Sequence, residues 1–270
     1  MPYRYDLPSE LELRCEGGIR LVTLNRPEQL NAAGPTMLWA LTELAGQLAE
    51  DDEAQVVILT GAGRAFSAGG DFQHFIKSSQ DADYARATLE NSRRFVERML
   101  ALPMPLIAAV NGAAVGFGAT LMALSDLVLM SDRAHIAEPH INVGLVVGDG
   151  ISFAWPLYMS LLRAKEYIYT GDSIAPEQAV ALGLANHVVA HDSLMDEARA
   201  LAEKLCRQPR TALRETKKIL NLHLQQSMAA VLDAMLERQF AQTQGPEHGA
   251  LVARMIERQQ QRRAERKSGQ

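Results

Sequence analysis

An apolar stretch from Leu106 to Leu124 most constrains how this chain can fold, because it carries no charge and must avoid water. The stretch is nearly long enough to span a lipid bilayer. The turn signal Asn111-Gly112 interrupts it, however, and neither Lys nor Arg lies close to either end. We therefore predict a buried strand, a tight turn and a buried helix, with no membrane partner.

Strand-like and helical stretches alternate over the first two thirds of the chain. Apolar residues recur at spacings of three and four from Met37 to Leu48, and residues 85–102 have the composition of a second helix. The strand-like runs are Leu11–Cys15, Ile19–Leu24, Val56–Thr60, Leu106–Val110 and Leu127–Met130. This alternation is typical of an α/β fold with crossover connections.

The last third of the chain has a different character. From about residue 192 the strand signals stop and the sequence is helical, interrupted at Pro209 and Gly245-Pro246. We predict a core domain over residues 1–191 and a helical region over residues 192–270. An apolar stripe in that region fits either an intramolecular core face or a subunit interface. Its members are Met228, Val231, Leu232, Met235, Leu236 and Phe240.

Composition argues against several classes of protein. A formal net charge of −5 disfavours a general nucleic-acid binder, and we predict no nucleic-acid partner. Cys15 and Cys206 share no redox or metal-ligand spacing, and the N-terminal residues carry no export signal, so we predict a cytoplasmic location. The histidines other than His140 show no metal-ligand spacing either, and we predict no metal.

Two glycine-rich segments each follow a predicted strand: GAGRAFSAGGDF at 61–72 and NGAAVGFGATL at 111–121. Neither matches a nucleotide-binding fingerprint. Glycine lets the backbone approach a ligand closely, and a helix that begins just afterwards directs unpaired N–H groups at that ligand. The segments are therefore consistent with an oxyanion site. Tight turns in a packed α/β domain are the alternative explanation.

These segments belong to a longer pattern. LNRPEQLNA at 24–32, AFSAGGDF at 65–72, IAAVNGAAVGFG at 107–118 and TGDSIAPEQAVALGLANHVV at 170–189 together resemble the crotonase, or enoyl-CoA hydratase and isomerase, family. The resemblance covers about residues 10–260. It implies a spiral of ββα units with a C-terminal helical trimerisation region, assembled as a homotrimer or hexamer. It also implies an acyl-CoA substrate, with coenzyme A as part of the substrate and no permanently bound cofactor.

The resemblance implies particular site residues as well. The backbone N–H groups of Gly70 and Phe117 are expected to hold the thioester oxygen and stabilise its enolate. Phe117 stands where the family usually has glycine, and Gln73 replaces a lysine that often meets the CoA phosphate. The residues expected near the substrate or its CoA are Glu28, Gln29, Ala32, Ala68, Asp71, Phe72 and Thr120.

The sequence departs from the family at the two glutamates that hydratases use for acid and base chemistry. Thr120 and His140 stand at these positions. A threonine hydroxyl does not ionise near neutral pH, whereas a histidine titrates there, so two-glutamate hydration is not predicted. Asp149 follows His140 by nine residues and is expected to orient it, which gives a one-base site. Glu138 is close to His140 in sequence, and on an extended segment one of its neighbours would face the other way.

The segment EPHINVGLVVGDGISFAWP is similar to the β-diketone hydrolase branch of the family, of which 6-oxocamphor hydrolase is an example. In that branch the corresponding His and Asp are implicated in carbon–carbon cleavage. A further histidine of that branch is replaced here by Gly118. We predict an enzyme of the hydratase and isomerase type that acts on an acyl-CoA thioester. The alternatives are a hydrolase of 1,3-diketones without CoA and a non-catalytic acyl-CoA-binding or scaffold protein.

Overall fold

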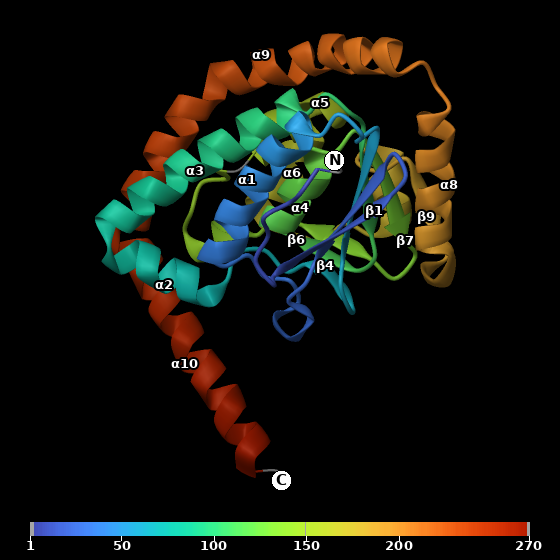
Figure 1. The fold of residues 1–270 in the computed structure, drawn as a ribbon. Helices are drawn as coiled ribbons and strands as arrows, with labels where there is room; N and C mark the ends of the chain where they lie inside the picture. The colour runs from blue at the N-terminus through green and yellow to red at the C-terminus, as the bar shows by residue number, and fades with distance from the viewer. Residues whose placement is uncertain (1–2, 149, 269–270) are drawn as a thin grey trace.

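The computed structural model describes residues 3–148 and 150–268, which form two β-sheets surrounded by helices (Figure 1). The strands are β1 Leu11–Glu16, β2 Ile19–Leu24, β3 Val56–Gly61, β4 Ala65–Ser67, β5 Leu106–Val110, β6 Ala113–Val115, β7 Leu127–Ser131, β8 His135–Ala137 and β9 His187–Val189. The helices are α1 Pro35–Glu50, α2 Phe72–Gln80, α3 Ala82–Ala101, α4 Phe117–Ala123, α5 Ile151–Tyr158, α6 Leu161–Thr170, α7 Pro176–Leu182, α8 Leu194–Cys206, α9 Arg210–Thr243 and α10 Pro246–Ser268. Short 3₁₀ turns are η1 Pro27–Gln29, η2 His140–Val143 and η3 His191–Ser193.

The sheet topology confirms the predicted spiral of ββα units. The larger sheet has the order β1-β2-β3-β5-β7-β9, and the smaller sheet has the order β4-β6-β8. Only the β1–β2 pair is antiparallel among these described strands. The successive pairs β3–β4, β5–β6 and β7–β8 each give one strand to each sheet, so the two sheets grow together along the chain.

The apolar stretch folds into a strand (β5), a turn and a helix (α4), as predicted, with the short strand β6 added between the turn and the helix. Every residue of β5 and α4 is buried. The turn at Asn111-Gly112 is held by Asn111, whose Oδ1 accepts from the N–H of Gly61 at 3.1 Å. A side chain on Gly112 would lie 2.1 Å from the carbonyl oxygen of Arg64, so only glycine fits there. No helix in the described part of the chain is long and apolar enough to cross a bilayer.

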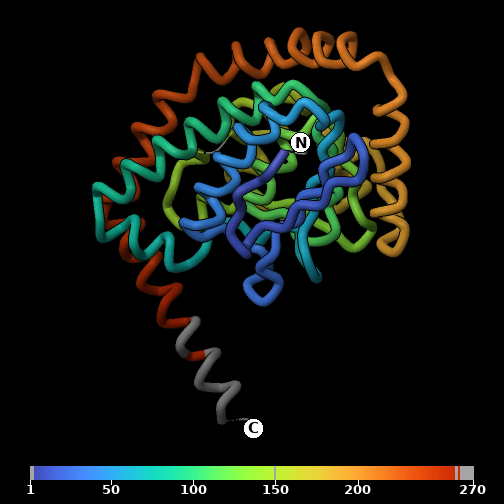
Figure 2. The backbone as a smooth tube through the Cα atoms, in the orientation of Figure 1, coloured from blue at the N-terminus to red at the C-terminus, as the bar shows by residue number. Residues whose placement is uncertain are grey.

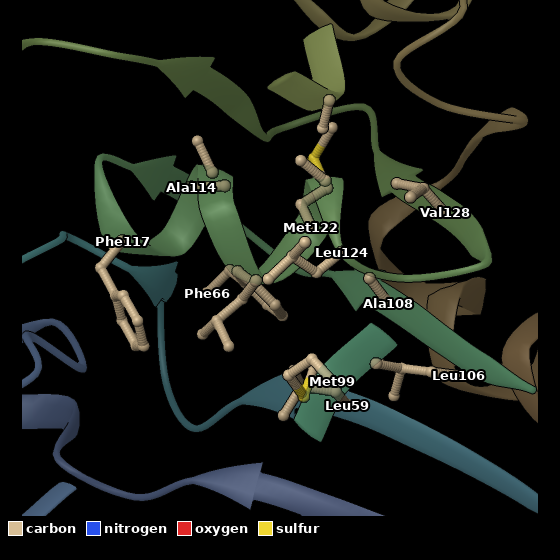
Figure 3. Close-up of a cluster of buried hydrophobic side chains, with 14 of the residues drawn as sticks. Leu59, Phe66, Met99, Leu106, Ala108, Ala114, Phe117, Met122, Leu124 and Val128 are labelled. Atoms are coloured by element: carbon tan, nitrogen blue, oxygen red, sulfur yellow. The ribbon is translucent and has the colours of Figure 1, made fainter. Parts of the chain in front are cut away.

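Two hydrophobic clusters lie on the two faces of the larger sheet. The main cluster joins the sheet to α1, α3, α4 and α5, and Figure 3 shows its part around Phe66, Phe117 and Met122. The second cluster joins the opposite face to α8, through residues that include Ala198 and Ala202. Helix α8 therefore covers the sheet directly, although it belongs to the region predicted as a separate helical unit.

Helix α9 passes over α3, and α10 then turns back toward α2 (Figures 1 and 2). Leu232, Met235 and Leu236 are buried in a cluster with Leu89 of α3. For these residues of the apolar stripe, the intramolecular alternative is confirmed. The turn between α9 and α10 at Gly245 matters for the site, because α10 then packs against α2.

Candidate active site

The two glycine-rich turns contact each other backbone to backbone. Gly69 has a φ of +94°, and a Cβ on it would lie 2.8 Å from the carbonyl oxygen of Val115. A Cβ on Gly118 would lie 2.4 Å from the carbonyl oxygen of Ser67. Because real Cβ atoms do not approach oxygen so closely, glycine is needed on both sides of this contact. The β4–α2 turn and the β6–α4 turn are thereby held at a fixed separation.

Each of these turns supplies one unpaired backbone donor. Phe117 is the first residue of α4, and the N–H groups of a first helical turn have no acceptor within the helix. Within residues 3–148 and 150–268, neither the N–H of Gly70 nor that of Phe117 makes a hydrogen bond. Both residues line a cavity of about 340 Å³. The two predicted oxyanion donors therefore border the same space.

The ring of Phe117 does not block this cavity. It is almost fully buried and lies against Phe95, with the ring centroids 5.2 Å apart. The side chain thus belongs to the hydrophobic core, and the residue also lines the cavity. The predicted role of Phe117 needs only its backbone N–H, so that role is compatible with a phenylalanine side chain directed into the core.

The predicted CoA residues lie on a loop beside the cavity. Ala68 lines the cavity, and its N–H donates to the carbonyl of Leu30 at 2.9 Å. The loop is fixed by buried Asn31, whose Nδ2 donates to the carbonyls of Ala62 and Ala65 at 2.9 and 2.8 Å. Glu28, Gln29 and Ala32 belong to this loop; Glu28 and Gln29 are exposed, and Ala32 is half-buried.

The structure gives Asp71 a role in the fold. Its Oδ1 accepts from the N–H of Gln73 at 2.9 Å and so caps α2, and its Oδ2 lies 2.9 Å from Nη1 of Arg26. Phe72, the next residue, begins α2 and is half-buried. Thr120 is fully buried in α4 and does not line the cavity. Its predicted contact with substrate stays a prediction.

Glu138, which was not among the predicted site residues, contacts His140. Its Oε1 contacts Nδ1 of His140 and also accepts the backbone N–H of His140 at 3.2 Å. Strand β8 ends at Ala137, and Pro139 has φ −95° and ψ 21°, so the chain turns into η2 instead of staying extended. Residues two positions apart share a face in a strand, and Glu138 and His140 stay in contact across this turn.

This contact defines the chemistry of the imidazole. Glu138 is fully buried, and a carboxylate stabilises the protonated form of a paired imidazole while fixing its orientation. His140 lines the cavity, and its Cε1 lies 3.9 Å from the position of a Cβ on Gly116, the residue before Phe117. The imidazole of His140 and the residues of both predicted backbone donors therefore border one cavity. Asp149 lies outside the described residues, and its pairing with His140 stays a prediction.

Two more histidines line the cavity, and sequence reasoning assigned neither of them to the site. Nδ1 of His74 lies 2.8 Å from the hydroxyl of Tyr84, and burial lowers the pKa of His74 to about 4, against the smaller opposing effect of Asp71. His248 comes from α10 and lies against Val143. No spacing pattern links these positions to His140. Among the described residues, no group of three His, Cys, Asp or Glu could hold a metal ion.

The chain is similar in sequence and in fold to known proteins of one family. Residues 14–261 match the family described as enoyl-CoA hydratase/isomerase. The short-chain-enoyl-CoA hydratase of Clostridium acetobutylicum is 31% identical over 79% of this chain and 81% of its own length. A crystal structure of an enoyl-CoA hydratase/isomerase from Mycobacterium paratuberculosis is 43% identical, with a TM-score of 0.90 over 93% of this chain and all of that one.

A second similar solved structure is that of an isomerase. A monofunctional enoyl CoA isomerase from Mycobacterium smegmatis is 31% identical, with a TM-score of 0.68 over 85% of this chain and 99% of that one. The chain belongs to the enoyl-CoA hydratase/isomerase family, that is, to the crotonase superfamily. The predicted family is thereby confirmed.

Proposed function

We propose that this protein acts on an acyl-CoA thioester, that the N–H groups of Gly70 and Phe117 stabilise an enolate, and that His140 moves the proton. One observation carries the proposal: two unpaired backbone donors and a carboxylate-paired imidazole border the same cavity. Coenzyme A enters as part of the substrate. The similarity to a short-chain-enoyl-CoA hydratase and to an enoyl CoA isomerase supports a thioester substrate.

The chemistry follows from these three groups. His140 takes a proton from the carbon next to the thioester carbonyl, and the electron pair moves to the carbonyl oxygen. The two N–H groups stabilise the charge on that oxygen, and Glu138 stabilises the imidazolium. Return of the proton at another carbon completes a double-bond migration. Water addition with one base and hydrolytic carbon–carbon cleavage pass through the same enolate.

A second candidate is hydrolysis of a 1,3-diketone without CoA. An imidazole paired with a carboxylate is suited to activating water, and here it replaces the paired glutamates of the hydratases. Gln73, which stands where a CoA-binding lysine is common, is exposed and uncharged. The third candidate is a non-catalytic acyl-CoA-binding or scaffold protein, for which loss of the two glutamates is the supporting observation.

Product detection by mass spectrometry in deuterium oxide separates these candidates. The purified protein is incubated with 2-enoyl-CoAs, 3-enoyl-CoAs and CoA-free 1,3-diketones. We expect solvent deuterium to enter the thioesters, and we expect this to be lost in His140→Ala but kept in His135→Ala, an exposed histidine on β8. Cleavage of the diketones alone would support the hydrolase. Turnover that persists in His140→Ala would contradict the assignment of the base.

We also propose a homotrimer or a hexamer. The support is a set of large apolar side chains that one subunit leaves in water on α6 and α9. Leu162 is 80% exposed, Ile219 is 65% exposed and Leu220 is 61% exposed. Ile219 and Leu220 are adjacent on α9, and neighbouring exposed apolar side chains of this size are typical of a protein interface. The cytoplasmic location stays a prediction.

A further inference from the structure

The direction of the Gly70 N–H is set by the loop that carries the predicted CoA residues. The N–H of Ala33 donates to the carbonyl of Gly69 at 2.7 Å, and the N–H of Asp71 donates to the carbonyl of Ala33 at 2.9 Å. Ala33 and Gly70 thereby form a parallel β-bridge. The carbonyl of Gly69 and the N–H of Gly70 belong to one trans peptide group, in which they point in opposite directions. The Gly70 N–H is therefore turned away from the loop.

The side chain of Arg26 joins the loop to the same turn. Its Nη1 donates to the carbonyl of Ala32 at 2.6 Å and lies 2.9 Å from Oδ2 of Asp71. Ala32 directly precedes Ala33, and Asp71 directly follows Gly70. One guanidinium nitrogen therefore bridges the two segments whose relative position sets the direction of the Gly70 N–H.

This bridge is partly shielded from water. The side chains of Arg26 and Asp71 are 18% and 16% exposed, and partly buried charges are screened less by salt than charges in open solvent. Gly34 leaves room for the pair, because a Cβ at that position would lie 3.1 Å from Nη1 of Arg26. Glu10 adds a second carboxylate, with its Oε1 3.5 Å from Nε of Arg26. The guanidinium is thus held by two acidic side chains and a carbonyl.

The backbone of Arg26 is fixed separately from its side chain. Its N–H donates to Oδ1 of Asn31 at 2.8 Å, and its carbonyl accepts from the N–H of Asn31 at 2.9 Å. Asn31 is fully buried and also bonds the β3–β4 turn through its Nδ2. We therefore expect the loop to stay folded when the side chain of Arg26 is removed. What is lost is the bridge to Asp71.

We propose that Arg26 is a positioning residue of the oxyanion site, which keeps the Gly70 N–H in line for the thioester oxygen by bridging Ala32 and Asp71. This inference rests on the proposed acyl-CoA function. Arg26 is not among the described residues that line the cavity, so it acts on the donor and not on the substrate. Small displacements matter at such a site, because misplacing a group by about 1 Å can cost about a hundredfold in rate.

Infrared spectroscopy of a bound thioester tests the proposal without requiring turnover. The probe is hexanoyl-CoA whose thioester carbonyl carries a heavy carbon isotope, bound to an excess of the full-length protein. A hydrogen bond to the carbonyl oxygen lowers its stretching frequency, so we expect a shift to lower wavenumber in the wild-type protein. We expect Arg26→Ala to lose part of this shift, because the donor of Phe117 remains. An unchanged shift in Arg26→Ala would overturn the proposal.

Entry of solvent deuterium at the carbon next to the carbonyl of hexanoyl-CoA gives a second readout. We expect the saturating rate of Arg26→Ala to fall by up to about a hundredfold. The concentration of half-maximal rate should change little, because a displaced donor weakens binding of the enolate more than binding of the thioester. Arg26→Lys should recover part of the rate, since its ammonium still faces Asp71. A loss confined to the concentration of half-maximal rate would contradict a positioning role.

The partner carboxylate gives an independent variant. Asp71→Asn keeps an oxygen to cap α2 but removes the charge that faces Arg26, so it should reduce the infrared shift as Arg26→Ala does. The double variant should be no worse than the more impaired single variant, because the two residues act through one contact. Additive losses would contradict the route through Asp71.

Arg98→Ala is the matched control. Nη1 of Arg98 donates to the carbonyl of Thr42 at 2.8 Å and lies 3.0 Å from Oε2 of Glu43, which repeats the pair of contacts made by Arg26. None of these three residues lines the cavity. Arg98→Ala should therefore keep the wild-type infrared shift, and a loss equal to that of Arg26→Ala would overturn the proposal.

The outcomes separate this inference from the proposed function. If the carbonyl of the probe does not shift on binding to the wild-type protein, both are overturned, because no donor then reaches the thioester oxygen. If the wild-type protein shifts the carbonyl and both Arg26→Ala and Asp71→Asn keep that shift, the inference alone is overturned.

Discussion

The carboxylate of Glu138 contacts Nδ1 of His140 across a single intervening residue. This relationship arises because Pro139 turns the chain between them, and Glu138 is fully buried at the end of β8. In the proposed function, this imidazole and its buried carboxylate take the place of the paired glutamates of the hydratases. Glu138 acts through His140, so its expected role is one of positioning and charge stabilisation.

Replacing Glu138 by Gln should therefore slow turnover without removing the base. A hydrogen bond to a charged group contributes about 1.5–3 kcal/mol, which corresponds to a fall in kcat of about tenfold to a hundredfold. Because the carboxylate favours the protonated ring, the acid limb of the kcat/KM profile should move to lower pH. Glu177→Gln, at an exposed position on α7, serves as the control. An unchanged pH profile in Glu138→Gln would show that the contact is only structural.

Gly69→Ala should damage the oxyanion site through the backbone. The new methyl group would meet the carbonyl of Val115 at 2.8 Å and push the Gly70 turn away from Phe117. We expect kcat to fall by about a hundredfold, as for loss of one oxyanion donor. Gly17→Ala is the matched control, because Gly17 also has a positive φ, of +59°, with nothing within 4 Å of its Cβ position. It should lower the free energy of unfolding by about 1 kcal/mol and leave kcat unchanged.

His74 should make the protein less stable as the pH falls. Burial lowers its pKa from 6.5 to about 4, so between these values the unfolded chain binds a proton that the folded protein does not. Stability is therefore retained above pH 6.5 and lost as the pH falls toward 4, by about 3 kcal/mol in all. Urea unfolding of His74→Gln should show a shallower pH dependence.

The control for this measurement is His135→Gln, on the exposed edge of β8. That side chain is in water in both states, so its removal should leave the pH dependence of the wild-type protein in place. A His74→Gln variant with the same slope as the wild type between pH 7 and pH 4 would contradict the burial argument.

Charged residues on the exposed apolar faces of α6 and α9 should weaken subunit assembly. Leu162→Glu combined with Ile219→Glu would place carboxylates in the proposed interface, where burial of an unpaired charge is unfavourable. We expect a smaller mass by light scattering, with an unchanged far-UV circular dichroism spectrum. Ala87→Glu, exposed on α3, should keep the mass of the wild-type protein. A wild-type mass in the double variant would exclude this face as the interface.

The sequence by itself determined the framework of the fold. The strands that begin at Leu11, Ile19, Val56, Leu106 and Leu127 were all predicted to within a residue of their observed bounds, because apolar runs between turn signals depend on local pattern. The helical last third was predicted for the same reason. Strands β4, β6 and β8 were not predicted, since three residues are too few to show a period of two.

Only the tertiary structure decided how the cavity is lined. Its residues come from α1, α2, α3, the β4–α2 and β6–α4 turns, η2, α9 and α10 among others, and no local pattern records that these segments meet. The pairing of Glu138 with His140 depended on one backbone turn, which a strand-like sequence pattern does not reveal. His248 and Ser78 became neighbours of the site because α10 folds back onto α2, a long-range contact set by packing and not by spacing along the chain.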